Sequence, residues 1–185
     1  MNSSTDTLPP AAGAPAAGTA VTPQALRAAL GMFATGVTII TARDTQGVLR
    51  GFTANSFNSV SLDPPLVLWS LAKTSSSFEA FAGCGHYAVN VLSAEQLPLA
   101  RRFATRGIDR WTWVEHQAGA GGSPVLAGSA AVFECAHRTV HEAGDHVIFI
   151  GEVVRCHHTP GTQPLLFHGG RFYSELPLAD EPDVR

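Results

Sequence analysis

The segment that decides the fold is residues 130–157, AAVFECAHRTVHEAGDHVIFIGEVVRCH. Its two halves, Ala130–His141 and His146–His157, are rich in valine, isoleucine and phenylalanine, which favour extended strands. Between them, Glu142–Asp145 places a glycine next to an aspartate, a pairing typical of tight turns. The segment therefore predicts two long antiparallel strands joined as a hairpin.

Shorter strands are predicted on both sides of this hairpin, at residues 37–42, 48–53, 66–71, 86–92, 165–168 and 171–173. Three short helices are expected: one from Pro23 along the stripe Ala25, Leu26, Ala29, Leu30 and Phe33 until Gly36, one at 78–81, and one from the capping box at Ser93 to about Ala104. Strands and helices do not alternate regularly, which disfavours a doubly wound parallel sheet. The predicted fold class is mainly β, an antiparallel barrel with a few short peripheral helices.

The composition excludes several functional classes. Of the 185 residues, 45% are hydrophobic and 15% are charged, which is enough apolar material for a folded core. The net charge of −3 leaves no basic surplus, and the apolar runs are too short to span a bilayer, so we expect neither nucleic acid nor a membrane as partner. Three cysteines without CxxC spacing argue against disulfides and indicate a reducing, cytoplasmic location.

The ends of the chain differ in composition from the rest. Residues 1–23 are dominated by alanine, proline, serine and threonine, with no lysine or arginine. Such a segment has little apolar surface to offset chain entropy, so we expect a disordered tail and no targeting signal. We expect one folded domain over residues 24–176 and a short tail over 177–185.

Eight histidines raise the question of a metal site. His137 and His141 lie four residues apart on a predicted strand, which separates them by roughly 13 Å, too far to share one ion. No carboxylate or cysteine completes a ligand set around His141 and His146. We therefore expect no metal.

Two stretches rich in hydroxyl and amide side chains, Thr53–Pro65 and Lys73–Ser77, offer groups to a ligand. Hydroxyls and one lysine ahead of a helix suit a phosphate, and asparagine and serine after a strand suit the edge of a heteroaromatic ring. The alternative is that both stretches are polar loops whose side chains bond the backbone.

A third candidate is Gly144-Asp145-His146 in the predicted hairpin turn. An aspartate beside a histidine orients the imidazole by a hydrogen bond and favours its charged form. The alternative is an exposed turn histidine without a role.

Six motifs, taken together and in this order, resemble the short-chain flavin reductase family, the reductase components of two-component flavin monooxygenases. The resemblance covers residues 25–173 and rests on Phe33–Thr41, Phe52–Phe57, Ser59–Leu66, Ala88–Leu92, Ala100–Ala104 and Gly144–His146. It implies an FMN-binding split β-barrel, a homodimer with flavin near the subunit interface, and reduction of FAD or FMN by NADH or NADPH. It also implies a separate monooxygenase that receives the reduced flavin.

The resemblance also implies roles for individual residues. His146, with Asp145, would be the catalytic group beside the nicotinamide, and Arg171 and Tyr173 would help to hold the nicotinamide nucleotide. Many relatives carry a small or thiol residue where Trp69 stands, which bears on the packing at the flavin. Flavin would be bound by Thr35, Gly36, Val37, Thr38, Thr53, Ala54, Asn55, Ser56, Ser59, Val60, Ser61, Leu62, Ser75, Ser76, Ser77 and Asn90.

Two other functions stay open at this point. One is an electron-transfer module that keeps its flavin and serves a fixed protein partner. The other is a non-catalytic flavin-binding barrel, since one fold hosts several functions.

Overall fold

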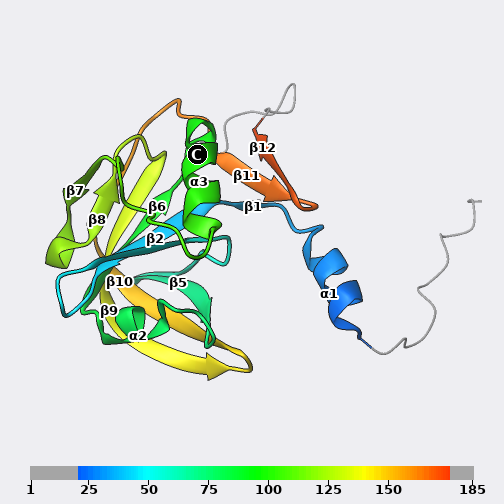
Figure 1. Ribbon diagram of the computed structural model, residues 1–185, viewed down its shortest axis with the longest axis horizontal. Helices are drawn as coiled ribbons and strands as arrows, with labels where there is room; N and C mark the ends of the chain where they lie inside the picture. Colours follow the sequence, from blue (N-terminus) through cyan, green and yellow to red (C-terminus); the bar gives the residue numbers. More distant parts are fainter. Residues whose placement is uncertain (1–20, 176–185) are drawn as a thin grey trace, which may run out of the picture.

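The computed structural model describes residues 21–175, so most of both predicted tails lies outside the described residues. A seven-stranded antiparallel sheet forms the body of the molecule, with strand order β3-β2-β6-β9-β10-β5-β4 (Figure 1). Its strands are β2 (Thr38–Arg43), β3 (Leu49–Ala54), β4 (Asn58–Leu62), β5 (Pro65–Ala72), β6 (His86–Val91), β9 (Ala131–Ala143) and β10 (His146–His158). The predicted mainly-β, antiparallel architecture is confirmed.

Two smaller sheets and a few short helices complete the fold. One sheet has the order β1-β11-β12, from β1 (Thr35–Gly36), β11 (Leu165–His168) and β12 (Arg171–Ser174). The other pairs β7 (His116–Ala118) with β8 (Pro124–Leu126). The helices are α1 (Pro23–Leu30), α2 (Phe78–Gly83) and α3 (Leu97–Ala104), with 3-10 turns η1 (Ala94–Gln96) and η2 (Ala120–Gly122).

The long hairpin β9–β10 is the centre of the sheet. β9 pairs with β6 on its other side, and β10 pairs with β5, so both strands have two neighbours. Gly144 in the turn has φ of +63°, a left-handed conformation that glycine adopts without steric cost. The hairpin predicted from the sequence is therefore confirmed, with each strand one residue longer than expected.

Large aromatic side chains fill the interior of the main sheet. Trp69 is fully buried, stacks on Phe149 with ring centroids 4.2 Å apart, and meets Tyr87 edge-on at 5.3 Å. Burial alternates along β5, and Trp69 points into the core; its effect on packing at the flavin stays a prediction. A second apolar cluster lies under α3, around Phe103 and Leu126.

Some boundaries differ from the sequence prediction for identifiable reasons. The first helix ends at Leu30, because the backbone turns at Gly31 before the apolar stripe reaches Phe33. Strands β1, β4, β7 and β8 were not predicted; each is short and gains its extended form from pairing with a neighbour. The capping box at Ser93 and Gln96 is confirmed, and it opens η1 before α3.

Within residues 21–175, no helix is both long and apolar enough to cross a bilayer. The same residues contain no group of three or more histidine, cysteine, aspartate or glutamate side chains arranged to hold a metal ion.

Candidate functional site

Two adjoining cavities open where β3 ends. The larger, of about 460 Å³, is lined by Arg27, Leu30, Gly31, Phe33, Thr35, Asn55, Ser56, Phe57, Asn58 and Phe167. The smaller, of about 210 Å³, is lined by Val37, Thr53, Ala54, Asn55, Ala104, Phe167 and Phe172. Because Asn55 and Phe167 line both cavities, the two form one continuous opening. Its size and mixed lining are those of a small-molecule or cofactor site.

Hydrogen bonds from side chains fix the walls of this opening. Thr38 Oγ1 donates to the carbonyl oxygen of Ala54 at 2.8 Å, which fastens β2 to the end of β3. Thr53 Oγ1 donates to the carbonyl oxygen of Ala100 at 2.6 Å, which fastens β3 to α3. The last residues of β3 are therefore held rigidly, while Asn55 is exposed in the opening.

One polar atom in the opening lacks a protein partner. Thr35 Oγ1 is buried and, among the described residues, has no hydrogen-bond partner. A buried hydroxyl without a partner is costly, by about 1–3 kcal/mol. The flavin ring system, which is flat and carries nitrogen and oxygen atoms along its edge, fits this set: apolar walls from Phe167, Phe172 and Ala54, and polar groups from Thr35 and Asn55.

A third cavity, of about 270 Å³, lies at the start of β3. It is lined by Leu49, Arg50, Gly51, Ser76, Ser77, Gly107, Ile108, Asp109, Arg110 and Trp111. Arg50, Arg110, Ser76 and Ser77 offer groups suited to a phosphate, whereas Asp109 adds a carboxylate and Arg50 Nε pairs with Asp44 Oδ2 at 2.8 Å. The two arginines were not predicted; the loop 105–111 that delivers Arg110 carries no motif, and the fold alone brings it to β3.

Gly51 allows this loop and α3 to lie close against β3. A Cβ atom at this position would lie 2.5 Å from Cε1 of Phe103 and 3.2 Å from Cζ2 of Trp111. The Arg110 guanidinium donates to the carbonyl oxygen of Gly51 at 2.8 Å and to that of Thr105. Only a glycine therefore fits where the loop crosses the strand.

The predicted stretch Lys73–Ser77 lies beside the predicted Asp145-His146 turn. The amide of Lys73 donates to the carbonyl oxygen of Asp145 at 2.9 Å, and Lys73 Nζ forms an ion pair with Glu142 at 2.9 Å. The structure thus joins two motifs that are about 70 residues apart in the sequence. Helix α2, which follows Ser77, has only six residues, and Ser77 makes no side-chain capping bond.

His146 stands at the first position of β10 with Asp145 as its partner. Its Nδ1 atom lies 2.8 Å from Asp145 Oδ1, and about half of its side-chain surface is exposed. The hydrogen bond and the charge of His146 hold the pKa of Asp145 below its usual value. Asp145 is therefore an ionised carboxylate that orients the imidazole.

The strand register relates His146 to the opening at Ser56. His146 pairs with Ala72, and Ile148 pairs with Ser70. Ser56 Oγ accepts a hydrogen bond from the Ser70 amide at 2.9 Å. Ser56 therefore lies beside β5 at Ser70, and His146 lies on β10, two residues along from the partner of Ser70.

Other predicted residues lie elsewhere. Asn90 is fully buried and lines none of the cavities above: its Nδ2 donates to the Ile39 carbonyl and to Thr41 Oγ1, both at 3.0 Å, and its Oδ1 accepts from the Leu126 amide at 2.8 Å. Gly36 is exposed in β1. Ser59, Val60, Ser61 and Leu62 form the edge strand β4, next to the opening but not part of its lining.

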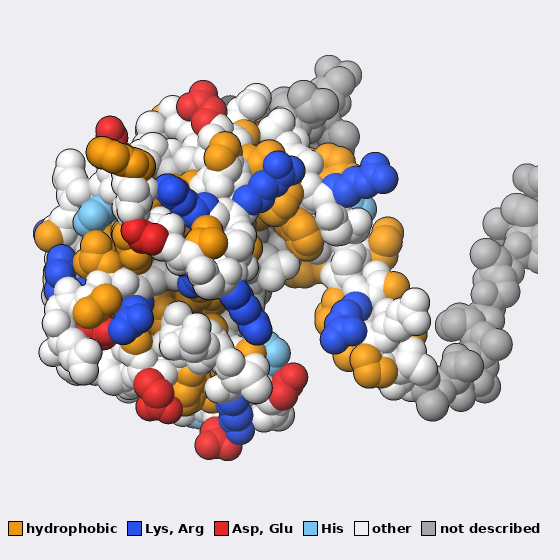
Figure 2. Space-filling model, in the orientation of Figure 1, with side chains coloured by type: hydrophobic (Ala, Val, Ile, Leu, Met, Phe, Trp, Pro, Cys, Tyr) orange, Lys and Arg blue, Asp and Glu red, His pale blue; other side chains and the backbone are white. Residues whose placement is uncertain are grey.

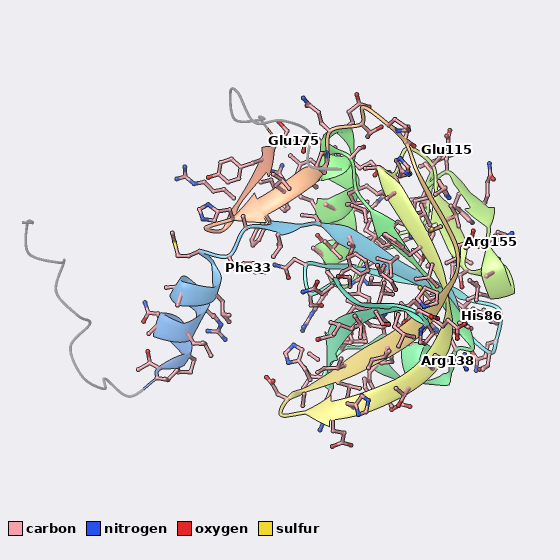
Figure 3. The ribbon with its side chains drawn as sticks, turned by 180° about the vertical axis from the view of Figure 1, so that it is seen from behind. Phe33, His86, Glu115, Arg138, Arg155 and Glu175 are labelled. Carbon is pink, nitrogen blue, oxygen red and sulfur yellow. The ribbon has the colours of Figure 1, made fainter. Side chains whose placement is uncertain are left out.

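The two groups predicted for the nicotinamide nucleotide are set apart in the fold. Arg171 and Tyr173 are exposed on β12, whereas His146 is at the tip of the β9–β10 hairpin. Figure 1 and Figure 3 show these two hairpins well apart, with the tip of β9–β10 at the bottom of the view and β11–β12 near the top. The structure does not bring them into contact.

The two buried thiols, those of Cys84 and Cys135, offer no nucleophile. Burial raises the pKa of the Cys84 thiol to about 11 and that of Cys135 to about 12. Both groups are therefore protonated and lie in the core.

Comparison with known proteins gives a consistent result. Residues 30–175 match the flavin reductase like domain. The chain is 49% identical over 151 residues to the FMN reductase (NADH) SmoA of Agrobacterium fabrum, covering 80% of this chain and 84% of that protein. It is 42% identical over 153 residues to the reductase subunit HsaB of a flavin-dependent monooxygenase from Rhodococcus jostii, covering 83% and 78%. Two other relatives are longer proteins, of which the chain spans 42% and 57%.

A solved structure shows the same fold. The NADH:FAD oxidoreductase SgcE6 of Streptomyces globisporus, in complex with NAD and FAD fragments, superposes with a TM-score of 0.81 at 41% identity. The match covers 88% of this chain and 100% of that chain.

Proposed function

The chain belongs to the flavin reductase-like family, and from this premise we propose that it transfers hydride from NADH or NADPH to FAD or FMN and supplies the reduced flavin to a separate monooxygenase. The observation that carries the proposal is the opening at the end of β3, whose lining combines aromatic side chains with Asn55 and with Thr35, a residue whose buried hydroxyl has no partner among the described residues. The names of the NADH-dependent FMN reductase and of the monooxygenase reductase subunit support the reaction and the partner.

In this proposal the flavin ring lies against Thr53–Ser56, with Thr35–Thr38 and Phe167 on the other side. Rigid attachment of Thr53 to α3 and of Thr38 to β3 holds these walls in place before the ligand arrives. The amides after Ala54 would stabilise negative charge on the edge of the reduced ring. Asn90 is not part of this assignment, because its amide is already used inside the protein.

The phosphate of the flavin would lie in the cavity at the start of β3. Arg50 and Arg110 supply positive charge, and Ser76 and Ser77 supply hydroxyl groups. Residues 50 and 54 are about 13 Å apart along an extended strand, a span that suits a flat ring and a linear side chain ending in phosphate. One strand would thus position both ends of the ligand.

The nicotinamide would approach near the exposed His146 at the start of β10. Bound flavin would supply the hydride acceptor. The protein would position the nicotinamide against it and exclude water. His146, oriented by Asp145, acts in this proposal as a positioning and electrostatic group. Arg171 and Tyr173 are proposed to contact the distal part of the nucleotide. Ser59–Leu62 remain a prediction as flavin contacts, since β4 lies just beyond the lining residue Asn58.

We further propose that the fold is an FMN-binding split barrel and that the protein is a homodimer. The antiparallel sheets and the superposition on SgcE6 support the first point. The resemblance to reductase components supports the second.

The test is a matrix of initial rates with NADH or NADPH and with FAD, FMN or no flavin. We expect oxidation of the nucleotide only when flavin is present. Gel filtration of the flavin-loaded protein then separates the alternatives: a flavin that stays bound, with no turnover of added flavin, favours an electron-transfer module. No oxidation with any flavin would overturn the enzyme assignment and favour a non-catalytic barrel.

A further inference from the structure

A groove of about 410 Å³ lies beside helix α3. Its walls come mainly from η1, α3 and the segment that leads into β7, and they include Pro98, Leu99 and Trp113. None of its lining residues lines the ligand opening or the cavity at the start of β3. Figure 3 shows Glu115, which lines the groove, on the other side of the body from Phe33, which lines the ligand opening. The groove is therefore a separate place in the molecule, and the proposed flavin reaction does not use it.

Trp113 is the residue of this groove with the most unusual conformation. In the part of the chain that the structure describes, it is the only non-glycine residue with positive φ, at +62°, and it is 93% exposed. A side chain with a Cβ atom adopts this left-handed conformation only at an energetic cost. The exposed indole also leaves a large apolar surface in water. Residues held in such conformations concentrate at active sites and ligand clamps, so Trp113 marks the groove as a candidate binding site.

Hydrogen bonds fix the residues just before Trp113. The Asp109 carboxylate accepts a hydrogen bond from the Trp111 amide at 2.8 Å and another from the Thr112 hydroxyl. Arg102 Nη1 donates to the carbonyl oxygen of Thr112 at 2.7 Å, which fastens this segment to α3. The backbone at Trp113 is therefore set by its neighbours before any ligand binds, and such preorganisation lowers the entropic cost of binding.

The charged residues of the groove favour a cation. Glu95 and Glu115 line it and are exposed, and none of the ion pairs within residues 21–175 includes either carboxylate. Arg102 is the one basic residue of the lining, so two carboxylates stand against one guanidinium. Figure 2 shows acidic and hydrophobic side chains next to one another at the upper left of the view, above β7. A ligand with a positive charge and an apolar surface would match this combination.

An exposed indole beside carboxylates suits one class of cation in particular. The face of a tryptophan ring attracts cations more strongly than that of any other side chain. A primary ammonium group is strongly hydrated, whereas the methyl groups of a quaternary ammonium pack against apolar residues such as Pro98 and Leu99. We infer that the groove binds a small organic cation with a quaternary ammonium group, with Trp113 against its methyl groups and Glu95 and Glu115 opposite its charge. This inference goes beyond the proposed function and does not depend on it.

The test compares two probes of equal shape, choline and its neutral isostere in which carbon replaces the nitrogen. Each is titrated into the full chain, and the heat of binding is measured at low ionic strength. We expect choline to bind about tenfold more tightly than the isostere, because only choline gains from the indole face and the carboxylates. The affinity for choline should fall as salt is added. Equal affinities for the two probes, or no binding of choline, would overturn the inference.

The NMR signals of the indole N–H groups locate the bound probe. The chain has three tryptophans, and the signal that is missing in Trp113→Phe belongs to Trp113. We expect choline to shift this signal, while the signal of Trp69, which is fully buried in the core, stays in place. Binding of choline without a shift of the Trp113 signal would place the cation elsewhere in the molecule and overturn the inference.

Variants then separate the two parts of the site, with thermal unfolding as the check that each variant is folded. Trp113→Leu keeps an apolar side chain without a ring face, and it should weaken choline binding about tenfold. Glu115→Gln should weaken it about threefold, whereas Glu79→Gln, an exposed position on α2 outside the groove, is the matched control and should leave it unchanged. Unchanged choline affinity in Trp113→Leu would overturn the inference. Choline binding at Trp113 in a chain without reductase activity would contradict the proposed function and leave this site standing.

Discussion

Two asparagines, Asn90 and Asn55, stand in opposite kinds of region, although both belong to the set expected to bind flavin. Asn90 is fully buried among the central strands, and its amide joins β2, β6 and β8 through three hydrogen bonds. Asn55 is exposed, follows the end of β3, and lines both halves of the ligand opening. A polar residue in a family motif therefore belongs either to the scaffold or to the site, and burial with satisfied hydrogen bonds distinguishes the two.

The largest expected effect comes from the scaffold asparagine. Asn90→Ala removes three buried hydrogen bonds and leaves the Leu126 amide and the Ile39 carbonyl without that partner. We expect a loss of about 3 kcal/mol in the free energy of unfolding, measured by urea titration. A loss of less than about 1 kcal/mol in the free energy of unfolding, together with weaker flavin binding, would assign Asn90 to the flavin site and contradict its role in the scaffold.

His146→Ala tests the proposed contact with the nicotinamide nucleotide at the start of β10. Loss of a charge-assisted contact should lower kcat/KM for the nicotinamide nucleotide by about 10- to 150-fold. The KM for the nucleotide should rise while flavin affinity stays near wild type, because the proposed flavin contacts come from other segments. His141→Ala, on the neighbouring strand near the same hairpin tip, is the control. Wild-type kinetics in His146→Ala would show that His146 is an exposed turn residue without a role in nucleotide binding.

Arg50→Gln tests the proposed phosphate position. Removing one guanidinium from the cavity shared with Ser76 and Ser77 should weaken FMN binding about tenfold, while riboflavin, which has no phosphate, should bind as before. Arg106→Gln serves as control, because Arg106 is exposed and lies outside that cavity. Equal losses for FMN and riboflavin would place the phosphate elsewhere.

Asn55→Ala is the counterpart of the first prediction. The side chain is exposed, so the free energy of unfolding should change by less than about 0.5 kcal/mol. Flavin affinity, followed by fluorescence quenching, should fall about fivefold through loss of a hydrogen bond to the ring edge. If the free energy of unfolding falls as much as in Asn90→Ala, Asn55 also belongs to the scaffold, and the two asparagines do not differ as described.

The smallest effect is expected at Trp113, which belongs neither to the buried scaffold around Asn90 nor to the ligand opening. Within residues 21–175 it is the one non-glycine residue with positive φ, at +62°, and it is 93% exposed. Trp113→Gly should stabilise the protein by about 0.5–1 kcal/mol, since glycine adopts this conformation without strain. The gain in stability is measured as a higher melting temperature in thermal unfolding, and flavin affinity should be unaffected. A lower melting temperature would show that the indole makes a stabilising contact.

The sequence predicts the long elements well and the short ones poorly. The β9–β10 hairpin and β2 are apolar, β-branched segments whose local pattern agrees with their place in the sheet. β4 and β7 have polar sequences, and they are strands because β5 and β8 supply hydrogen-bond partners. Such strands are fixed by topology, which no local pattern contains.

The candidate site also contains residues that the sequence identifies and residues that it does not. Thr53–Ser56 and the Asp145-His146 turn are contiguous polar stretches, so the sequence identifies them. Arg50 and Arg110 come from separate segments that meet only in the folded chain, and the same is true of Asn55 and Phe167. Residue type alone also misplaces Asn90, because an asparagine that binds a ligand and one that joins three strands look identical in sequence.

Hydride transfer itself is the most direct test of the central claim. The wild-type protein, loaded with FMN or FAD, is mixed with excess NADH in the absence of oxygen, and the absorbance of oxidised flavin is followed in time. We expect the absorbance to disappear in a single turnover that is much slower in His146→Ala, and we expect free flavin without protein to react far more slowly. Persistence of oxidised flavin in the wild type, with NADH and with NADPH alike, would contradict the proposed flavin reductase activity.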